Sequence, residues 1–169
     1  IEKIEKEVEI KSHNEFIGVT NKITELESEI RTLKEKKAEY KKQMMRAIGN
    51  FRLDTLRGYL TAQDALVEIV QKSNRLSAYS YLCMTYRELW PLSHQDAKDH
   101  ATLQAVLRRA QKINPKSPSA NVCLVVSYWV KGQYDDALRI MDSHLEKSPG
   151  LLFFNQMSGD IYAARKDYR

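Results

Sequence analysis

The first fifty residues carry apolar side chains at alternating intervals of three and four residues. The run comprises Phe16, Val19, Ile23, Leu26, Ile30 and Leu33, and then Tyr40, Met44, Ala47 and Phe51, with Lys37 at the one interrupted position. These are the a and d positions of a heptad repeat, and charged residues fill most of the places between them. The pattern predicts a long coiled-coil helix whose narrow apolar stripe needs a partner helix to cover it.

Upstream of this run, Ile1, Ile4 and Val8 keep the same rhythm one residue out of phase. Ser12-His13-Asn14 lies between the two runs, and Gly18 follows at the start of the second run. No proline and no paired turn residues occur there, which favours a phase slip within one helix over a turn. We expect residues 19–51 to form one uninterrupted helix. Lys37 at a core position favours a low oligomer number. The predicted oligomerisation seam of a homodimer is Val19, Ile23, Leu26, Ile30, Leu33, Tyr40 and Met44.

The rest of the chain has the short apolar stripes of packed helices. Thr61–Asp64 has the composition of a helix start, and Ala65, Leu66, Ile69 and Val70 follow it as an apolar stripe. Strand signals are absent, so the chain is predicted to be all-α. We divide it into a coiled-coil helix over 1–57, a connecting helix over 58–73 and a region of helical hairpins over 74–169.

The clearest hairpin lies at 118–151. Lys131-Gly132-Gln133 predicts the end of one helix, and Tyr134 with Asp135 and Asp136 predicts the start of the next, with acids in its first turn. Ser148-Pro149-Gly150 then predicts the end of the second helix.

The same segment has a spaced series of large, aromatic, glycine, aromatic, alanine and proline residues, namely Leu124, Tyr128, Gly132, Tyr134, Ala137 and Pro149. With this series the segment resembles a tetratricopeptide repeat, which is a unit of two antiparallel helices. Val125 and His144 depart from the pattern, because they stand where the family has small residues.

Partial units flank the best one. Residues 152–169 resemble the first helix of a following unit, through Gly159, Tyr162, Lys166 and Tyr168. Residues 74–117 resemble a degenerate preceding unit, through Leu82, Cys83 and Tyr86 and then Ala110 and Pro115. Its excess length falls at 90–94, where Pro91 must end the first helix and Ser93 or Asp96 can cap the second.

The resemblance implies an α-solenoid, a curved stack of helical hairpins with a groove that binds a peptide or a helix. Trp129 is either a groove anchor or a core residue, and so is Trp90. The Lys and Asn clamp that family members use for chaperone carboxylates is missing, so an apolar or amphipathic ligand is favoured. The family's groove positions fall on Ser80, Met84 and Arg87, on Val122, Val126 and Trp129, and on Gln156 and Asp160.

Composition and charge leave a second function open. The net charge is +5, and Lys34–Arg46 is locally basic, which is a hint of contact with nucleic acid or an anionic membrane. A solvated coiled-coil face explains the same lysines, and Tyr40 is the only aromatic residue among them, which disfavours nucleic acid. The favoured function is a non-catalytic protein-interaction adaptor or scaffold. The alternative is a basic coil that contacts nucleic acid or membrane, with the repeats as support.

The residues of an enzyme or a cofactor site are not found in the sequence. It has no glycine-rich phosphate loop, no cysteine pair at zinc spacing and no nucleophile elbow, so we expect neither catalysis nor a cofactor. His94, Asp96, Asp99 and His100 could hold a metal, but a polar loop that caps a helix explains them better.

Cys83 and Cys123 lie in apolar helical segments, where we expect reduced thiols that pack as small hydrophobes. Reduced thiols suit a reducing compartment, and we expect a cytoplasmic location. No run of about eighteen apolar residues occurs, so no transmembrane segment is expected. Since the sequence begins at Ile1 and ends within a repeat-like pattern, we expect it to be a piece of a longer protein.

Overall fold

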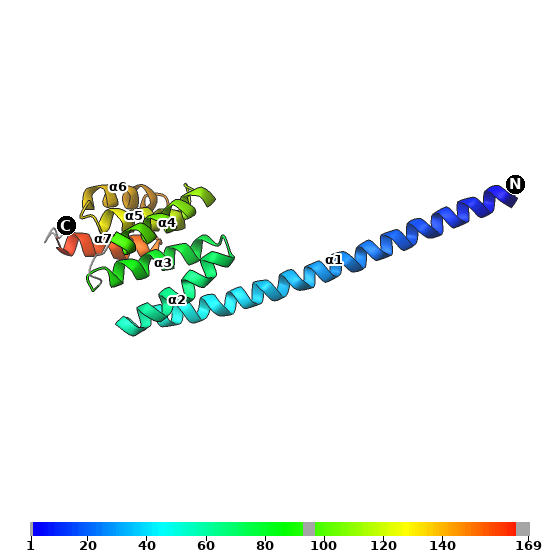
Figure 1. Ribbon diagram of the computed structural model, residues 1–169. Helices are drawn as coiled ribbons and strands as arrows, with labels where there is room; N and C mark the ends of the chain where they lie inside the picture. The colour runs from blue at the N-terminus through cyan, green and yellow to red at the C-terminus, as the bar shows by residue number, and fades with distance from the viewer. Residues whose placement is uncertain (1, 93–96, 165–169) are drawn as a thin grey trace. The chain divides into compact units, whose positions relative to one another are not determined.

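The computed structural model describes residues 2–92 and 97–164, and these residues form seven helices and no strand (Figure 1). The prediction of an all-α chain is therefore confirmed. The helices are α1 (Glu2–Phe51), α2 (Leu56–Lys72), α3 (Leu76–Leu89), α4 (Ala97–Ile113), α5 (Pro118–Trp129), α6 (Tyr134–Leu145) and α7 (Leu152–Ala164).

The first helix is continuous through the change of heptad phase. Gly18 lies within α1, and nothing approaches the place where its Cβ would be. The predictions of a phase slip within one helix and of an uninterrupted helix over 19–51 are therefore confirmed. The side chains of Ile1, Ile4 and Val8 lie outside the described residues.

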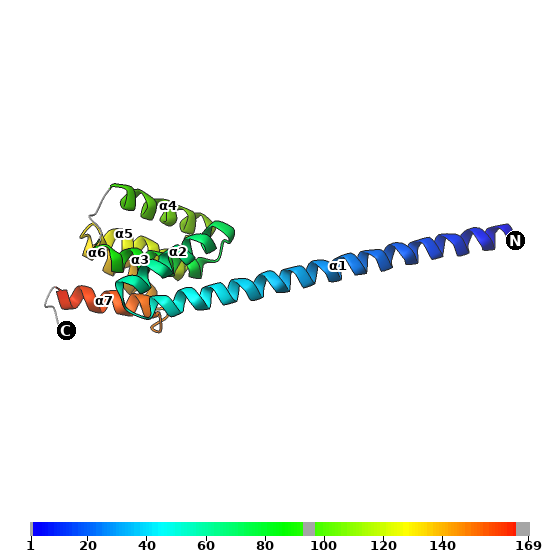
Figure 2. The ribbon, with the colours of Figure 1, turned by 60° about the horizontal axis from the view of Figure 1, so that its bottom comes forward.

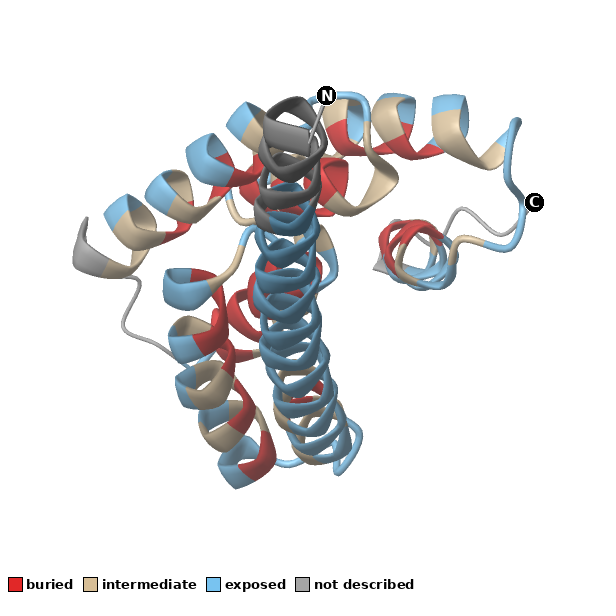
Figure 3. Cartoon of the chain, turned by 90° about the vertical axis from the view of Figure 1, so that its right-hand side faces the viewer, coloured by how far each residue is buried: buried red, intermediate tan, exposed pale blue. Residues whose placement is uncertain are grey.

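The chain divides into two compact units, residues 1–42 and residues 43–169. The first unit consists of α1 up to Lys42, and from Glu15 to Glu39 every residue is exposed. The helices of the second unit each carry a buried side, shown in red in Figure 3. Among the residues whose burial the structure describes, the hydrophobic core begins at Met44 and lies in the second unit.

The helices of the second unit pack in a continuous series. α2 packs on α3, α3 on α5, and α5 on α6 (Figures 1 and 2). α4 covers α3 and α5, and α7 packs on α6. The core between them contains small and large apolar side chains that interlock, among them Ala78, Leu82, Leu103, Ala120, Val125, Ala137, Met141, Phe154 and Ile161.

The turn between α5 and α6 follows the local sequence. Gly132 has a φ of 72°, a conformation that glycine adopts without steric cost. Its N–H donates to the Trp129 carbonyl at 2.9 Å, and the Gln133 N–H donates to the Tyr128 carbonyl at 3.0 Å. This pair of bonds is the Schellman motif, which satisfies the last carbonyls of α5. The predicted helix end and restart at residues 131–134 are confirmed.

The start of α2 differs from the prediction. The helix begins at Leu56, because the Thr55 hydroxyl accepts a hydrogen bond from the Gly58 N–H at 3.0 Å and caps the first turn. Thr61, where the sequence predicted a start, lies inside the helix and donates to the Arg57 carbonyl at 2.8 Å. Thr55 is thus the helix start that was missed.

The end of α3 also bears on the predicted repeats. α3 ends at Leu89, just before Pro91, as predicted. The proposed caps Ser93 and Asp96 lie outside the described residues, as do Lys166 and Tyr168 of the partial unit after 152.

Candidate protein-interaction site

Three of the predicted groove residues meet, and they come from three different helices. Arg87 of α3 forms an ion pair through its Nη2 with Oδ2 of Asp160 in α7. The guanidinium carbon of Arg87 lies 5.2 Å from the centre of the Trp129 ring, which α5 supplies, so the cation faces the ring. Residues 73 positions apart in the sequence are thereby joined on one surface.

The charges in this Arg87 cluster (Arg87, Glu88, Trp129 and Asp160) do not balance. The Arg87 side chain is only 7% exposed, and its Nη1 also donates to Oε1 of Glu88 at 2.7 Å. Burial raises the pKa of Glu88, the nearby Arg87 lowers it, and Asp160 and Asp54 raise it further. Two carboxylates share one guanidinium, and the Asp160 side chain, at 48% exposed, is open to a further cation.

The other predicted groove residues are mostly covered. Ser80, Met84, Val122 and Val126 are buried within the packed helices, and Met84 and Val126 have no exposed surface. The predicted apolar centre of the groove is therefore interior surface in this structure. Trp129 is half-buried, and the Tyr134 ring lies edge-on to it with the ring centres 6.5 Å apart. Gln156 is exposed.

An apolar hollow adjoins Ser80 and Val122. It has a volume of about 230 Å³ and is lined by residues of α3, α5 and α7 and the turn before α7. The rings of Tyr81 and Phe153 lie edge to face in it, with their centres 4.8 Å apart, and Phe51 packs against both rings. Sequence reasoning missed this aromatic cluster, although the Phe153-Phe154 pair at the start of α7 was a visible signal.

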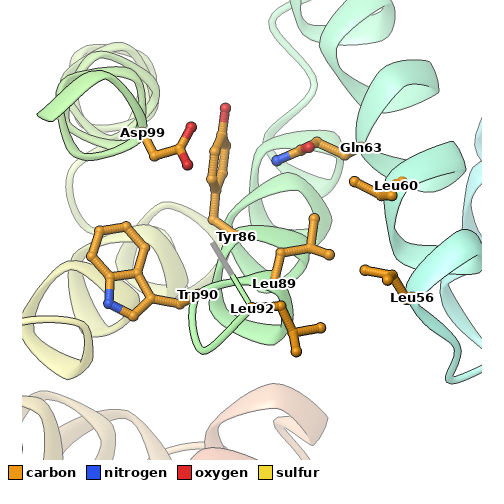
Figure 4. Close-up of a pocket in the computed structure, with 8 residues that line it drawn as sticks. All are labelled: Leu56, Leu60, Gln63, Tyr86, Leu89, Trp90, Leu92 and Asp99. Atoms are coloured by element: carbon orange, nitrogen blue, oxygen red, sulfur yellow. The ribbon is translucent and has the colours of Figure 1, made fainter. Parts of the chain in front are cut away.

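A second pocket, of about 390 Å³, lies among α2, α3 and the start of α4 (Figure 4). Exposed leucines form its rim, and Trp90, one of the two predicted anchors, is buried in its wall. The centres of the Trp90 and His100 rings are 5.9 Å apart. Burial and the neighbouring Asp99 raise the pKa of the Tyr86 hydroxyl. The lining residues are Leu56, Leu60, Gln63, Tyr86, Leu89, Trp90, Leu92 and Asp99.

The two cysteines are not the reduced thiols that the sequence predicted. Cys83 of α3 and Cys123 of α5 form a disulfide, with their Cα atoms 5.2 Å apart. Both residues are fully buried. The expectation was wrong because the packing of α3 on α5 brings the two cysteines together. The apolar residues next to each cysteine in the sequence do not reveal that packing.

The predicted oligomerisation seam is in two different environments. Val19, Ile23, Leu26, Ile30 and Leu33 are all exposed, Tyr40 is half-buried, and Met44 is buried within the second unit. The stripe thus passes from open to covered along one helix. The covered end belongs to residues 43–169.

The described residues contain no group of three metal-ligating side chains placed to hold an ion. Of the sequence candidates, His94 and Asp96 lie outside the described residues. No described helix is both long and apolar enough to cross a membrane.

No protein-family model, curated protein or solved structure matches this chain. The tetratricopeptide resemblance therefore stays a prediction that rests on the residues quoted for it.

Proposed function

We propose that the chain is a non-catalytic adaptor, in which the long helix joins two copies and the helical hairpins hold a peptide or helix of another protein. The observation that carries the proposal is the meeting of Arg87, Trp129 and Asp160, which the tetratricopeptide resemblance assigns to one binding surface. Aromatic and arginine side chains dominate the energetics of protein interfaces.

The chemistry of the Arg87 cluster favours one kind of ligand. It offers a half-buried indole beside a surplus of carboxylate, and the exposed part of that carboxylate belongs to Asp160. An amphipathic helix or peptide with an apolar side chain next to a lysine or arginine complements both features.

The test uses a phage-displayed library of amphipathic helical peptides selected on the full chain. Trp129→Ala should weaken the binding of a selected peptide by about 2 kcal/mol, measured by calorimetry, because the change removes a buried aromatic contact with the peptide. Met45→Ala is the matched control, since Met45 is an exposed apolar residue of α1. The proposal fails if no peptide is selected, or if Trp129→Ala melts early while its folded fraction binds normally.

A second candidate function rests on the lysines between Lys34 and Lys42, which are exposed along α1. They give the alternative in which a basic coil contacts nucleic acid or an anionic membrane. Binding of duplex DNA or anionic vesicles that falls steeply between 50 and 200 mM salt would favour that candidate, because counterion release dominates such binding.

A cytoplasmic location stays a prediction, and the disulfide weighs against it. Disulfides persist in oxidising compartments and are rare where thiols are kept reduced. The Cys83–Cys123 bond therefore favours an oxidising environment for this domain.

A further inference from the structure

The open part of the seam has no cover among the described residues. Phe16 is 69% exposed, Leu33 is 64% exposed, and the four seam residues between them are exposed by 44–59%. Further along the same stripe, Met44 is 6% exposed and Ala47 is fully buried. A helix gains little stability from its own turns, so a stripe of this length indicates a partner helix that covers residues 16–33.

The apolar residues from Phe16 to Leu33 differ between the two heptad positions. The spacing puts Phe16, Ile23 and Ile30 at position a, and Val19, Leu26 and Leu33 at position d. Isoleucine at a with leucine at d favours two parallel strands, because each side-chain shape fits the geometry of its own layer. Lys37 occupies the next a position, where a single polar residue sets register and oligomer number.

The charges beside the seam favour the same arrangement. In a parallel, in-register pair, each g residue faces the e residue five positions later in the other copy. Lys22 then faces Glu27, and Glu29 faces Lys34, so both are opposite-charge pairs that occur twice by symmetry. Lys36 and Lys41 form the one like-charge pair, beyond the last open apolar layer at Leu33.

We propose that residues 16–34 of α1 pair with the same residues of a second copy of this chain, as a parallel, in-register two-stranded coil. The inference rests on the proposed adaptor function and specifies its dimer. Because residues 43–169 follow the coil in each chain, both copies of the helical hairpins leave from the same end. A ligand with two linked binding segments would then gain effective concentration.

Disulfide trapping tests the register in the full chain. Val19→Cys and Leu33→Cys lie at two d positions fourteen residues apart, and each should form a covalent dimer in a glutathione redox buffer. An antiparallel coil brings a residue next to its own copy only at the crossing point, so it cannot trap both variants. Ser28→Cys on the opposite side of the helix is the matched control and should stay monomeric on a denaturing gel. The unaltered chain gives the background from Cys83 and Cys123, which are bonded to each other.

Charge reversal is the independent measurement. Glu29→Lys or Lys34→Glu alone should weaken dimerisation roughly three- to tenfold at low salt, because each turns two attractive pairs into repulsive ones. The double variant should recover the affinity. In an antiparallel coil, g faces g and e faces e, so the double variant should not recover.

The outcomes separate the two proposals. A monomer at high concentration by sedimentation overturns both the dimer and its register. A stable dimer in which only one cysteine variant, or neither, is trapped overturns the parallel register and leaves the adaptor dimer standing. Trapping of both variants with recovery in the double charge variant supports the register.

Discussion

The same kind of apolar stripe is buried in one unit of the chain and exposed in the other. Within residues 43–169 each helix packs its apolar side on a neighbour from the same chain, and Met44 and Ala47 at the end of α1 are part of that buried surface. From Phe16 to Leu33, within residues 1–42, the stripe of α1 stays exposed. A heptad pattern thus predicts that one side of a helix is buried against other helices. Whether those helices belong to the same chain depends on the rest of the fold.

The largest effect is expected where the stripe is open. Changing Leu26 and Ile30 together to Asp should weaken dimerisation at least ten-thousandfold, about 5.5 kcal/mol, because the dimer would place four charges without partners in the seam. Sedimentation measures the dimer, and Ser28→Asp on the opposite face is the control. The unfolding transition of the second unit, followed by the fluorescence of Trp90 and Trp129, should be unchanged. Normal dimerisation of the double variant would show that the dimer interface lies elsewhere than on this seam.

The next effect concerns a covalent link inside the packed unit. The disulfide closes a loop of 40 residues, so reducing it should lower the free energy of unfolding by about 4 kcal/mol. Tryptophan fluorescence during urea unfolding, with and without reductant, measures the loss. Cys83→Ala and Cys123→Ala should each reproduce it and become insensitive to reductant. Two free thiols in the intact native chain by mass spectrometry would contradict the pairing.

A smaller effect is expected at Gly58, where the start of α2 lies close to the backbone at the end of α1. A Cβ on Gly58 would lie 2.5 Å from the Asn50 carbonyl oxygen, and backbone cannot give way cheaply. Gly58→Ala should therefore destabilise the second unit by about 1–3 kcal/mol in the same urea assay.

Gly49→Ala is the matched control for that change. Gly49 is an exposed helical residue with nothing within 4 Å of an added Cβ, so alanine should stabilise by about 0.5–1 kcal/mol. Equal effects at the two glycines would show that the close approach at Gly58 is absent.

The smallest effect is a pH dependence in the packed unit. Burial, and then the nearby Lys147, lower the pKa of His144 from its ordinary 6.5. The side-chain amide of Asn121 lies 3.0 Å from Nε2 of His144, and it can donate there only while that nitrogen carries no proton. The folded chain therefore binds this proton less readily than the unfolded chain, so His144 costs no stability above pH 6.5 and reduces it as the pH falls below that value.

His144→Gln should flatten the loss of stability between pH 7.5 and 5.5, followed by the urea midpoint of tryptophan fluorescence. His13→Gln, which changes an exposed histidine in the first unit, should leave the slope as it is. An unchanged slope in His144→Gln would assign the acid sensitivity to other groups. Glu88, whose pKa is raised, acts in the opposite direction, because its protonation stabilises the fold as the pH falls.

The sequence alone determined the features that depend on neighbouring residues. The three-four rhythm from Phe16 to Phe51 predicted one long helix, because helical periodicity is local. Gly132 predicted the end of α5, because only a residue that tolerates positive φ closes that turn easily. Pro91 predicted the end of α3 for a similarly local reason, the lack of a backbone donor.

The tertiary structure decided what depends on distant residues. The Cys83–Cys123 bond, the burial of Met84 and Val126, and the meeting of Arg87 with Asp160 all arise where α3, α5 and α7 are brought together. The apolar stripe at Met44 looks like that at Leu26 in the sequence, yet only Met44 is covered by its own chain. Periodicity identifies the side of a helix that must be buried, but the packing of other helices determines what buries it.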